Sequence, residues 1–142
     1  MKVDIRDLQS RVKFDSKKIV QRAQFVLNKM GEDKGELSLL FVADSYIRQL
    51  NSKYRKVDSK TDVLAFSMRE GYGLPKVSPI LGDVVISTET AKREAKKRGV
   101  SIQSEIELYL VHGILHLLGY KDERTRDRKK MRAKEKELLR VM

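Results

Sequence analysis

The spacing of apolar residues along the chain predicts four strands and five helices. Apolar residues alternate with polar ones, or run together over a few positions, in residues 2–8, 36–42, 61–68 and 82–87, as expected of strands. Elsewhere they recur every three or four residues, which is the spacing of one helix face. The predicted order of elements is therefore β-α-β-α-β-β-α-α-α.

Polar capping residues and glycines set the predicted helix ends. A side chain that accepts a hydrogen bond from a free backbone N–H favours a helix start, and glycine favours a helix end. The first helix is expected to run from Asp15 or Ser16 to Gly31, and the third from Thr88 to Gly99.

The second helix is predicted to be short, from a cap at Asp44 or Ser45 to about Ser52, with residues 54–60 irregular after it. Its inward residues are expected to be Tyr46, Ile47 and Leu50. The last two helices are expected to start at Ser101 or Ser104 and at Thr125 or Asp127. Residues expected to face inward from the final helix are Met131, Leu138, Leu139 and Val141.

These elements predict one α/β (α+β) domain over residues 1–142. The strands at 61–68 and 82–87 are joined by a loop at 71–80 and should pair antiparallel, whereas helical crossovers demand parallel neighbours, so the four-stranded sheet is mixed. Strand 61–68 is apolar enough to be a central strand and strand 2–8 an edge strand. About five helices cover the sheet, and the helix near residue 112 lies in the middle of the core.

The chain's two histidines, His112 and His116, lie four residues apart on that apolar helix. At this spacing both imidazoles project from one face and can bind one metal ion. Gly119 can end the helix in a left-handed turn, and Asp122 then offers an oxygen ligand on the returning chain. Two imidazoles and a carboxylate leave one position open, as in catalytic zinc sites. The alternative is a pair of hydrogen-bonded core histidines, but burying two imidazoles without partners is costly.

This spacing matches the zinc-binding helix of metalloproteases in all but one position. Those enzymes carry H-E-x-x-H, in which Glu is the general base, and Gly113 stands in its place here. Peptide hydrolysis by the usual route is therefore disfavoured.

The composition limits which side chains can bind a metal and which partners are expected. The chain has no cysteine, so a metal must rest on His, Asp or Glu. A net charge of +11 favours a polyanionic partner, although it can also serve solubility alone. The first ten residues contain no apolar targeting segment, and no apolar run is long enough to span a bilayer, so a soluble cytoplasmic protein with no membrane partner is expected.

Three segments together resemble one known family, the YbeY endoribonucleases and rRNA maturation factors. They are the run HGILHLLGY at 112–120, the residues Leu81, Gly82 and Asp83 before 84–87, and a set that comprises Asn51, Tyr54, Arg55, Asp58, Thr61, Asp62, Val63, Leu64 and Phe66. Their order and spacing are similar to the family's from about residue 51 to residue 122.

The resemblance implies a zinc-dependent endoribonuclease that prefers single strands. It also implies a role in maturation of the 16S rRNA 3′ end and in ribosome quality control, with RNA and the small ribosomal subunit as partners. The family holds one zinc ion with three histidines. Two of them match His112 and His116, but Asp122 stands at the third position, and Lys60 stands where the family usually has proline.

In the mechanism that the resemblance implies, Arg55 matches the family's basic residue and would hold a phosphate as the catalytic side chain. The general base stays open among metal-bound hydroxide, the RNA 2′-hydroxyl, and a carboxylate such as Asp83 or Glu123. Asp62 is expected at a turn or behind the ligands. Base stacking could come from Tyr54, Phe66, Tyr72 or Tyr120, and phosphate contacts from the basic helices at 92–98 and 121–140.

Two alternatives remain from the sequence. One is a zinc metallopeptidase-like hydrolase, because the ligand spacing is shared. The other is a non-catalytic ribosome-assembly factor in which a structural metal fixes the helix and its turn. The oligomeric state is left open.

Overall fold

In the computed structural model, which describes residues 1–71 and 78–140, four strands form one mixed sheet in the order β1-β2-β4-β3. β1 (Lys2–Asp7), β2 (Glu36–Val42) and β4 (Ile80–Ser87) run parallel. β3 (Val63–Ser67) pairs antiparallel with β4. The mixed sheet, the antiparallel pairing and the edge position of β1 are confirmed.

The prediction that residues 61–68 form a central strand is wrong, because β3 is the second edge of the sheet. Its apolar run has another cause, since both of its faces are covered. Val63 and Ala65 belong to the main core, and Leu64 and Phe66 pack in a second cluster. A strand covered on both faces looks the same in sequence whether or not a further strand pairs with it.

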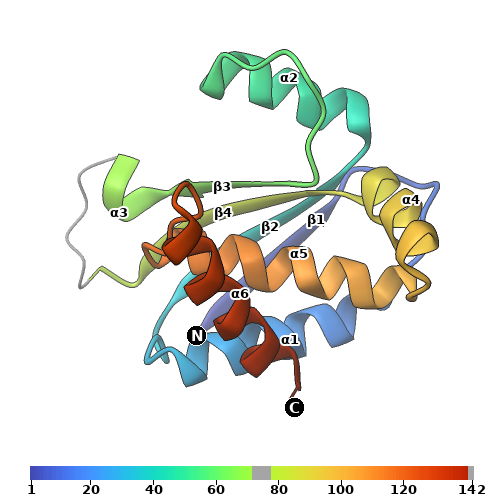
Figure 1. Ribbon diagram of the computed structural model, residues 1–142. Coiled ribbons are helices and arrows are strands. Elements are labelled where there is room, and N and C mark those ends of the chain that lie inside the picture. The colour runs from blue at the N-terminus through green and yellow to red at the C-terminus, as the bar shows by residue number, and fades with distance from the viewer. Residues whose placement is uncertain (72–77, 141–142) are drawn as a thin grey trace.

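The helices lie on both sides of the sheet (Figure 1). α2 (Asp44–Arg55) lies alone on one side, where Ile47 packs with Val42, Leu64 and Val85. On the other side lie α1 (Ser16–Lys29) and α5 (Ile102–Leu117), with α6 (Thr125–Arg140) against α5 and α4 (Thr88–Arg98) at the end of the sheet. No helix in the described part of the chain combines the length and apolar character that a bilayer crossing requires.

α5 is the central helix, as predicted. It contacts β3, β4, α1, α4 and α6, and Ile106, Leu110, Ile114 and Leu115 on it are fully buried. Burial of four such side chains contributes roughly 6–12 kcal/mol of hydrophobic stabilisation before the loss of conformational entropy. This packing fixes the helix that carries the two histidines.

Two of the predicted helix starts are confirmed by a capping side chain. Asp15 caps α1 and Ser101 caps α5, each by accepting a hydrogen bond from the backbone N–H three residues later. The Thr88 cap is wrong by one residue, because Ser87 accepts the bond from the N–H of Thr90.

The largest error concerns α2. Its N-cap is Ala43, which has no capping side chain, and Asp44 is already helical. The Asp44 carboxylate instead accepts hydrogen bonds from Ser87, Thr90 and Arg93 of the neighbouring elements. The inward prediction holds for Ile47, but Tyr46 is 40% exposed. The helix also continues past Ser52 to Arg55, so the predicted irregular segment begins later.

The predicted loop at 71–80 falls largely on residues 72–77, which lie outside the described residues. Before it the chain forms one further helical turn, α3 (Met68–Gly71), which the sequence did not predict. After it β4 begins at Ile80, two residues earlier than expected. Val141, expected to face inward, also lies outside the described residues.

Candidate metal centre

The end of α5 folds back so that three potential ligands meet. Leu118 caps the helix, and Gly119 adopts the left-handed conformation at φ 98° that residues with a side chain rarely adopt. The N–H of Tyr120 bonds to the carbonyl of Leu115, and that of Gly119 to the carbonyl of His116. These are the two bonds of a Schellman turn. The turn returns the chain toward the histidines and brings Asp122 beside them.

The three ligand atoms form a small triangle. The Nε2 atoms of His112 and His116 are 3.1 Å apart, and Asp122 Oδ2 lies 3.3 Å from the second and 3.7 Å from the first. An ion held tetrahedrally at about 2.0–2.1 Å from its ligands sets neighbouring donor atoms about 3.3–3.4 Å apart. The triangle therefore has the size of one face of such a tetrahedron, and the group could hold a metal ion.

The other nitrogen of each imidazole has an acceptor. His112 Nδ1 lies 2.5 Å from Glu135 Oε2, and His116 Nδ1 lies 3.0 Å from the carbonyl oxygen of Tyr120. A carbonyl can only accept, so the proton of a neutral His116 sits on Nδ1, and an ionised Glu135 sets the same tautomer in His112. Both Nε2 atoms then lie 3.1 Å apart with their lone pairs directed to one place, which a metal ion or one additional proton can occupy.

Glu135 also changes the acidity of its partner. Burial of the His112 ring lowers its pKa, but the hydrogen bond to Glu135 and the charges of Glu135, Asp62 and Asp122 together outweigh burial, so the pKa is raised overall. Both effects of Glu135 favour a positive charge on or beside the ring. The carboxylate would in the same way strengthen His112 as a ligand for a cation.

Glu135 was missed in the sequence, although a signal was present. It lies on α6 with the buried residues Met131 and Leu138, four residues after one and three before the other, and is itself only 9% exposed. A carboxylate in the apolar stripe of a helix needs a buried partner. That requirement points to a polar group next to the core, and the two histidines, which lie on an otherwise apolar helix, are the natural candidates.

Gly113 lets α5 approach the sheet closely. A Cβ atom at this position would lie 2.5 Å from Cγ1 of Val84 and 3.3 Å from Cγ2 of Val63. The side of the helix that carries Glu in the metalloprotease motif is here pressed against β3 and β4. A carboxylate base therefore has no room at position 113, which adds a steric reason to disfavour peptidase chemistry.

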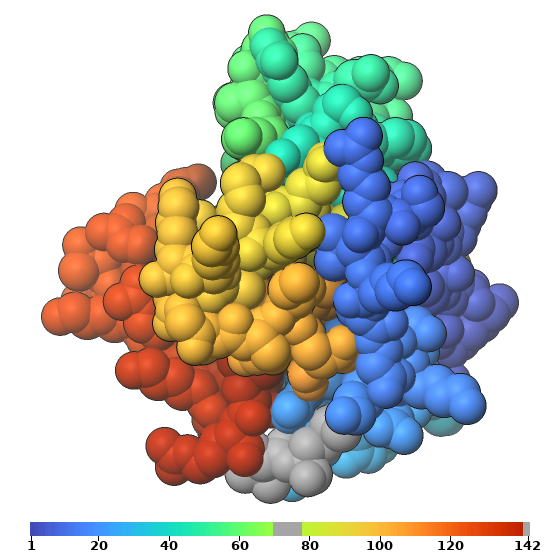
Figure 2. All heavy atoms as spheres, turned by 90° about the vertical axis from the view of Figure 1, so that its right-hand side faces the viewer, coloured from blue at the N-terminus to red at the C-terminus, as the bar shows by residue number. Residues whose placement is uncertain are grey.

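The histidines open on a cleft of about 850 Å³ between α5 with its turn on one side and β3 with the end of α2 on the other. In the space-filling view, the surface is notched between α2 and the residues after α5 (Figure 2). Asp122 is the most exposed of the three potential ligands, with 45% of its side chain exposed against 29% for each histidine. An ion held by these three side chains would therefore be approached from the Asp122 side of the cleft.

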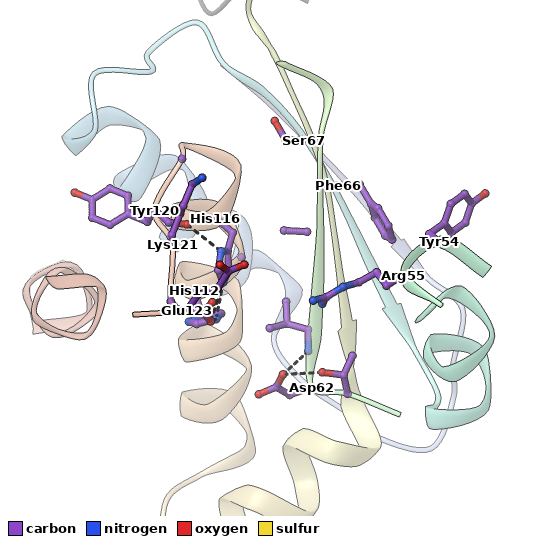
Figure 3. A pocket seen from close by; sticks show the side chains of 16 residues that line it. Tyr54, Arg55, Asp62, Phe66, Ser67, His112, His116, Tyr120, Lys121 and Glu123 are labelled. Carbon is purple, nitrogen blue, oxygen red and sulfur yellow. Dashed lines mark hydrogen bonds and ion pairs between the residues drawn. The ribbon is translucent and has the colours of Figure 1, made fainter. Parts of the chain in front are cut away.

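Arg55 lies across the cleft from the histidines. It is exposed on the last turn of α2 and extends toward β3 and the cleft (Figure 3). Within the described residues it makes no hydrogen bond or ion pair. The extra turn of α2 beyond Ser52 is what places this guanidinium at the cleft, free to bind an anion.

Most of the other residues predicted as a general base or for base stacking line the cleft, but not all of them do. Asp62 and Glu123 line the cleft, as do Tyr54, Phe66 and Tyr120. Asp83 does not line it and pairs with the backbone of Phe66 in the β3–β4 ladder. Tyr72 lies outside the described residues.

Comparisons with known proteins agree with this architecture. The family model described as Endoribonuclease YbeY matches residues 4–142. A protein named Endoribonuclease YbeY from Pelotomaculum thermopropionicum is 46% identical over 98% of this chain and 95% of its own length. One of the same name from Aquifex aeolicus is 48% identical over 75% of this chain and 69% of its own. The solution structure of TM1509 from Thermotoga maritima superposes with a TM-score of 0.62 at 20% identity, over 96% of this chain and 86% of the other, which shows the shared fold.

Proposed function

The chain belongs to the Endoribonuclease YbeY family and is a nuclease of the hydrolase class, and from this premise we propose how and on what it acts. It cuts single-stranded RNA with one zinc ion held by His112, His116 and Asp122, and Arg55 is its catalytic cation. Its substrate is ribosomal RNA, at the 3′ end of the 16S species and in ribosome quality control, and the small ribosomal subunit is its partner in the cytoplasm.

The metal site is proposed from one observation. The two Nε2 atoms and Asp122 Oδ2 form a triangle of the size that one ion requires, and the Nδ1 atom of each histidine has a hydrogen-bond acceptor. Core histidines without a metal also have hydrogen-bond partners, but here two Nε2 atoms and one carboxylate oxygen converge beside a cleft. Nitrogen and carboxylate donors at tetrahedral spacing fit zinc, and three ligands leave a position for substrate or water. Asp122 in place of a third histidine makes the set of ligands more negative.

When bound, the ion supplies Lewis-acid chemistry to a phosphodiester and to water in the open position. The chain's own residues supply the remainder. Arg55 reaches the cleft from the opposite wall, so its guanidinium can bind two phosphate oxygens and stabilise the negative charge that develops on them. Apart from Asp122, the carboxylates that line the cleft are Asp62 and Glu123. We propose that one of these two, and not Asp83, accepts a proton lost in the reaction.

The charges of the lining favour metal-dependent RNA binding. Asp62, Asp122 and Glu123 outnumber the cations Arg55 and Lys121 among the residues around the cleft. With neutral histidines this surface is slightly negative and repels phosphates, whereas a divalent cation makes it positive. RNA should therefore bind the cleft more tightly when the metal is present.

α6 is the better of the two basic helices for contact with RNA. On α4, Arg93 pairs with Asp44 and Arg98 with Glu105, so several cations there already have acidic partners. α6 follows directly from Lys121 and Glu123 at the cleft. Its first two turns expose five basic residues, Arg126, Arg128, Lys129, Lys130 and Arg132.

The experiment is a cleavage assay on a labelled single-stranded RNA with the sequence of the 16S 3′ end and on the same sequence in a duplex. Arg55→Ala should lower kcat about 10- to 150-fold, because a hydrogen bond to a charged group contributes about 1.5–3 kcal/mol. Arg48→Ala is the matched control, since Arg48 lies on the same helix but pairs with Asp58 away from the cleft. Equal cleavage by both variants would remove Arg55 from the mechanism.

Two other results would redirect the proposal. Cleavage of casein that a chelator abolishes would favour the peptidase alternative. Sedimentation with small subunits, without RNA cleavage under any metal, would favour the non-catalytic assembly factor.

A further inference from the structure

Tyr54 is an exposed aromatic ring at the edge of the cleft. It precedes Arg55 on the last turn of α2 and is 55% exposed, more than any other large apolar or aromatic side chain that the structure describes. An aromatic ring left in water costs hydrophobic free energy. Because the ring lies beside the proposed phosphate-binding arginine, it is exposed where it can contact a bound nucleic acid.

The ring is held in place by its neighbours. Its centroid lies 5.5 Å from that of Phe66 on β3, with the ring planes at 68°, an edge-to-face arrangement. Phe66 is itself part of the apolar cluster under α2, so it is a fixed support. The ammonium of Lys53 lies 5.2 Å from the Tyr54 ring centroid. The ring thus has a firm backing and a positive charge beside it, the combination used by proteins that bind single-stranded nucleic acid.

The other tyrosines that the structure describes do not combine this exposure with this position. Tyr120 lines the cleft and has the Lys130 ammonium 5.9 Å from its ring centroid, but its ring is half-buried against the core. Tyr46 is exposed on the same helix as Tyr54, but it does not line the cleft. Tyr109 is buried. Among the described residues, Tyr54 alone joins high exposure to a position beside Arg55 in the cleft.

The close-up shows how the two neighbours diverge (Figure 3). Arg55 extends from α2 toward the histidine side of β3, whereas Tyr54 and Phe66 lie together on the other side of that strand. β3 is an edge strand, so no strand pairs along the rim between them. A chain of nucleotides that crosses this rim can place one phosphate at Arg55 and the neighbouring base on Tyr54.

We infer that Tyr54, backed by Phe66, is a binding site for one unpaired nucleobase next to the phosphate held by Arg55. This inference rests on the proposed function and adds a specificity residue to it. A base stacked on Tyr54 cannot lie in a duplex at the same time. The platform therefore gives a physical reason for a preference for single strands at this cleft.

The test is equilibrium binding of a short fluorescein-labelled single-stranded RNA to the zinc-loaded protein, read by anisotropy directly after mixing, with the intact RNA fraction checked on a gel. Loss of one stacked base costs about 1–3 kcal/mol, so Tyr54→Leu should weaken binding about 5- to 150-fold. Tyr54→Phe keeps the ring and should bind within about twofold of wild type. Tyr46→Leu removes an exposed tyrosine from the same helix and should change nothing.

A second set of binding measurements identifies which base of the RNA stacks on Tyr54. The same RNA is made with one base removed at successive positions, and wild-type protein should lose affinity at one position beside the cleavage site. In Tyr54→Leu that position should no longer matter. Wild-type affinity in Tyr54→Leu, an unchanged penalty for the missing base, or no RNA binding by the wild type would each overturn the inference. Binding that depends on Tyr54 without any cleavage on the gel would instead overturn the proposed function and leave the platform standing.

Discussion

Glu135 on α6 lies 2.5 Å from Nδ1 of His112, on the opposite side of the ring from the metal-facing Nε2. The bond joins the last helix of the chain to the candidate metal centre. Carboxylates in this position orient the imidazole and raise its basicity as a ligand, and their loss typically lowers metal affinity 10- to 100-fold.

We therefore expect Glu135→Ala to bind zinc about 10- to 100-fold more weakly than wild type in a titration against a competing chelator. Glu135→Gln keeps an acceptor oxygen and loses the charge, so its affinity should fall between the two. Glu137→Gln is the control, because Glu137 is exposed on the same helix and pairs with Lys134. If Glu135→Ala and Glu137→Gln bind zinc equally well, Glu135 has no part in the site.

The close approach at Gly113 gives a prediction about stability. Gly113→Ala forces a methyl group into the space of Val84, and overpacking of this kind costs about 1–3 kcal/mol of unfolding free energy. Val84→Ala makes room, so the double variant should lose less than the sum of the two single losses. Urea unfolding of the four proteins measures this coupling, and strictly additive losses would contradict the steric account.

Asp44 gives a prediction about pH. Burial raises the pKa of its carboxyl, but hydrogen bonds from Arg93, Ser87 and Thr90 together outweigh burial and lower the pKa from 3.8 to about 2. Because the folded pKa lies below the unfolded one, the carboxylate stabilises the fold above about pH 4, and this stability is lost as the pH falls toward 2. The shift corresponds to about 2 kcal/mol at neutral pH.

Asp44→Asn should therefore lower the unfolding free energy by about 2 kcal/mol at neutral pH, and the difference from wild type should shrink as the pH approaches 2. Asp58→Asn is the control, since Asp58 forms an exposed pair with Arg48 and such pairs contribute little. A difference between Asp44→Asn and wild type that stays constant from neutral to acid pH would show that the charge of Asp44 is not the cause.

Most of the fold could be predicted from the sequence because the spacing of apolar residues and the residues at element ends determine most helices and strands. The strand at 36–42 was placed to the residue, and the helix at 88–98 was placed with its cap one residue away, since both are bounded by clear polar or glycine positions. The helix that carries the histidines was predicted to be central because it has apolar residues on all of its sides. What failed depends on contacts between distant segments: Asp44 was taken for a cap because its true partners lie more than forty residues away.

The site was predicted in part for the same reason. His112, His116 and Asp122 lie within eleven residues of each other, so spacing alone brought them together. Arg55 was named only through the family resemblance, and Glu135 was not predicted, because the last turn of α2 and the packing of α6 on α5 are what place them at the site. Periodicity also could not show that β3 is an edge strand, although that edge is what leaves the cleft open.

We propose that His112, His116 and Asp122 hold the metal with which the protein cuts RNA. The most direct test is the rate of cleavage of a single-stranded RNA by metal-stripped protein as zinc is added back, with Asp122→Ala beside the wild type. We predict that wild-type cleavage is absent without zinc and saturates near one ion per chain, while Asp122→Ala stays inactive over the same range. Cleavage by the stripped wild type, or equal activation of Asp122→Ala, would contradict the account.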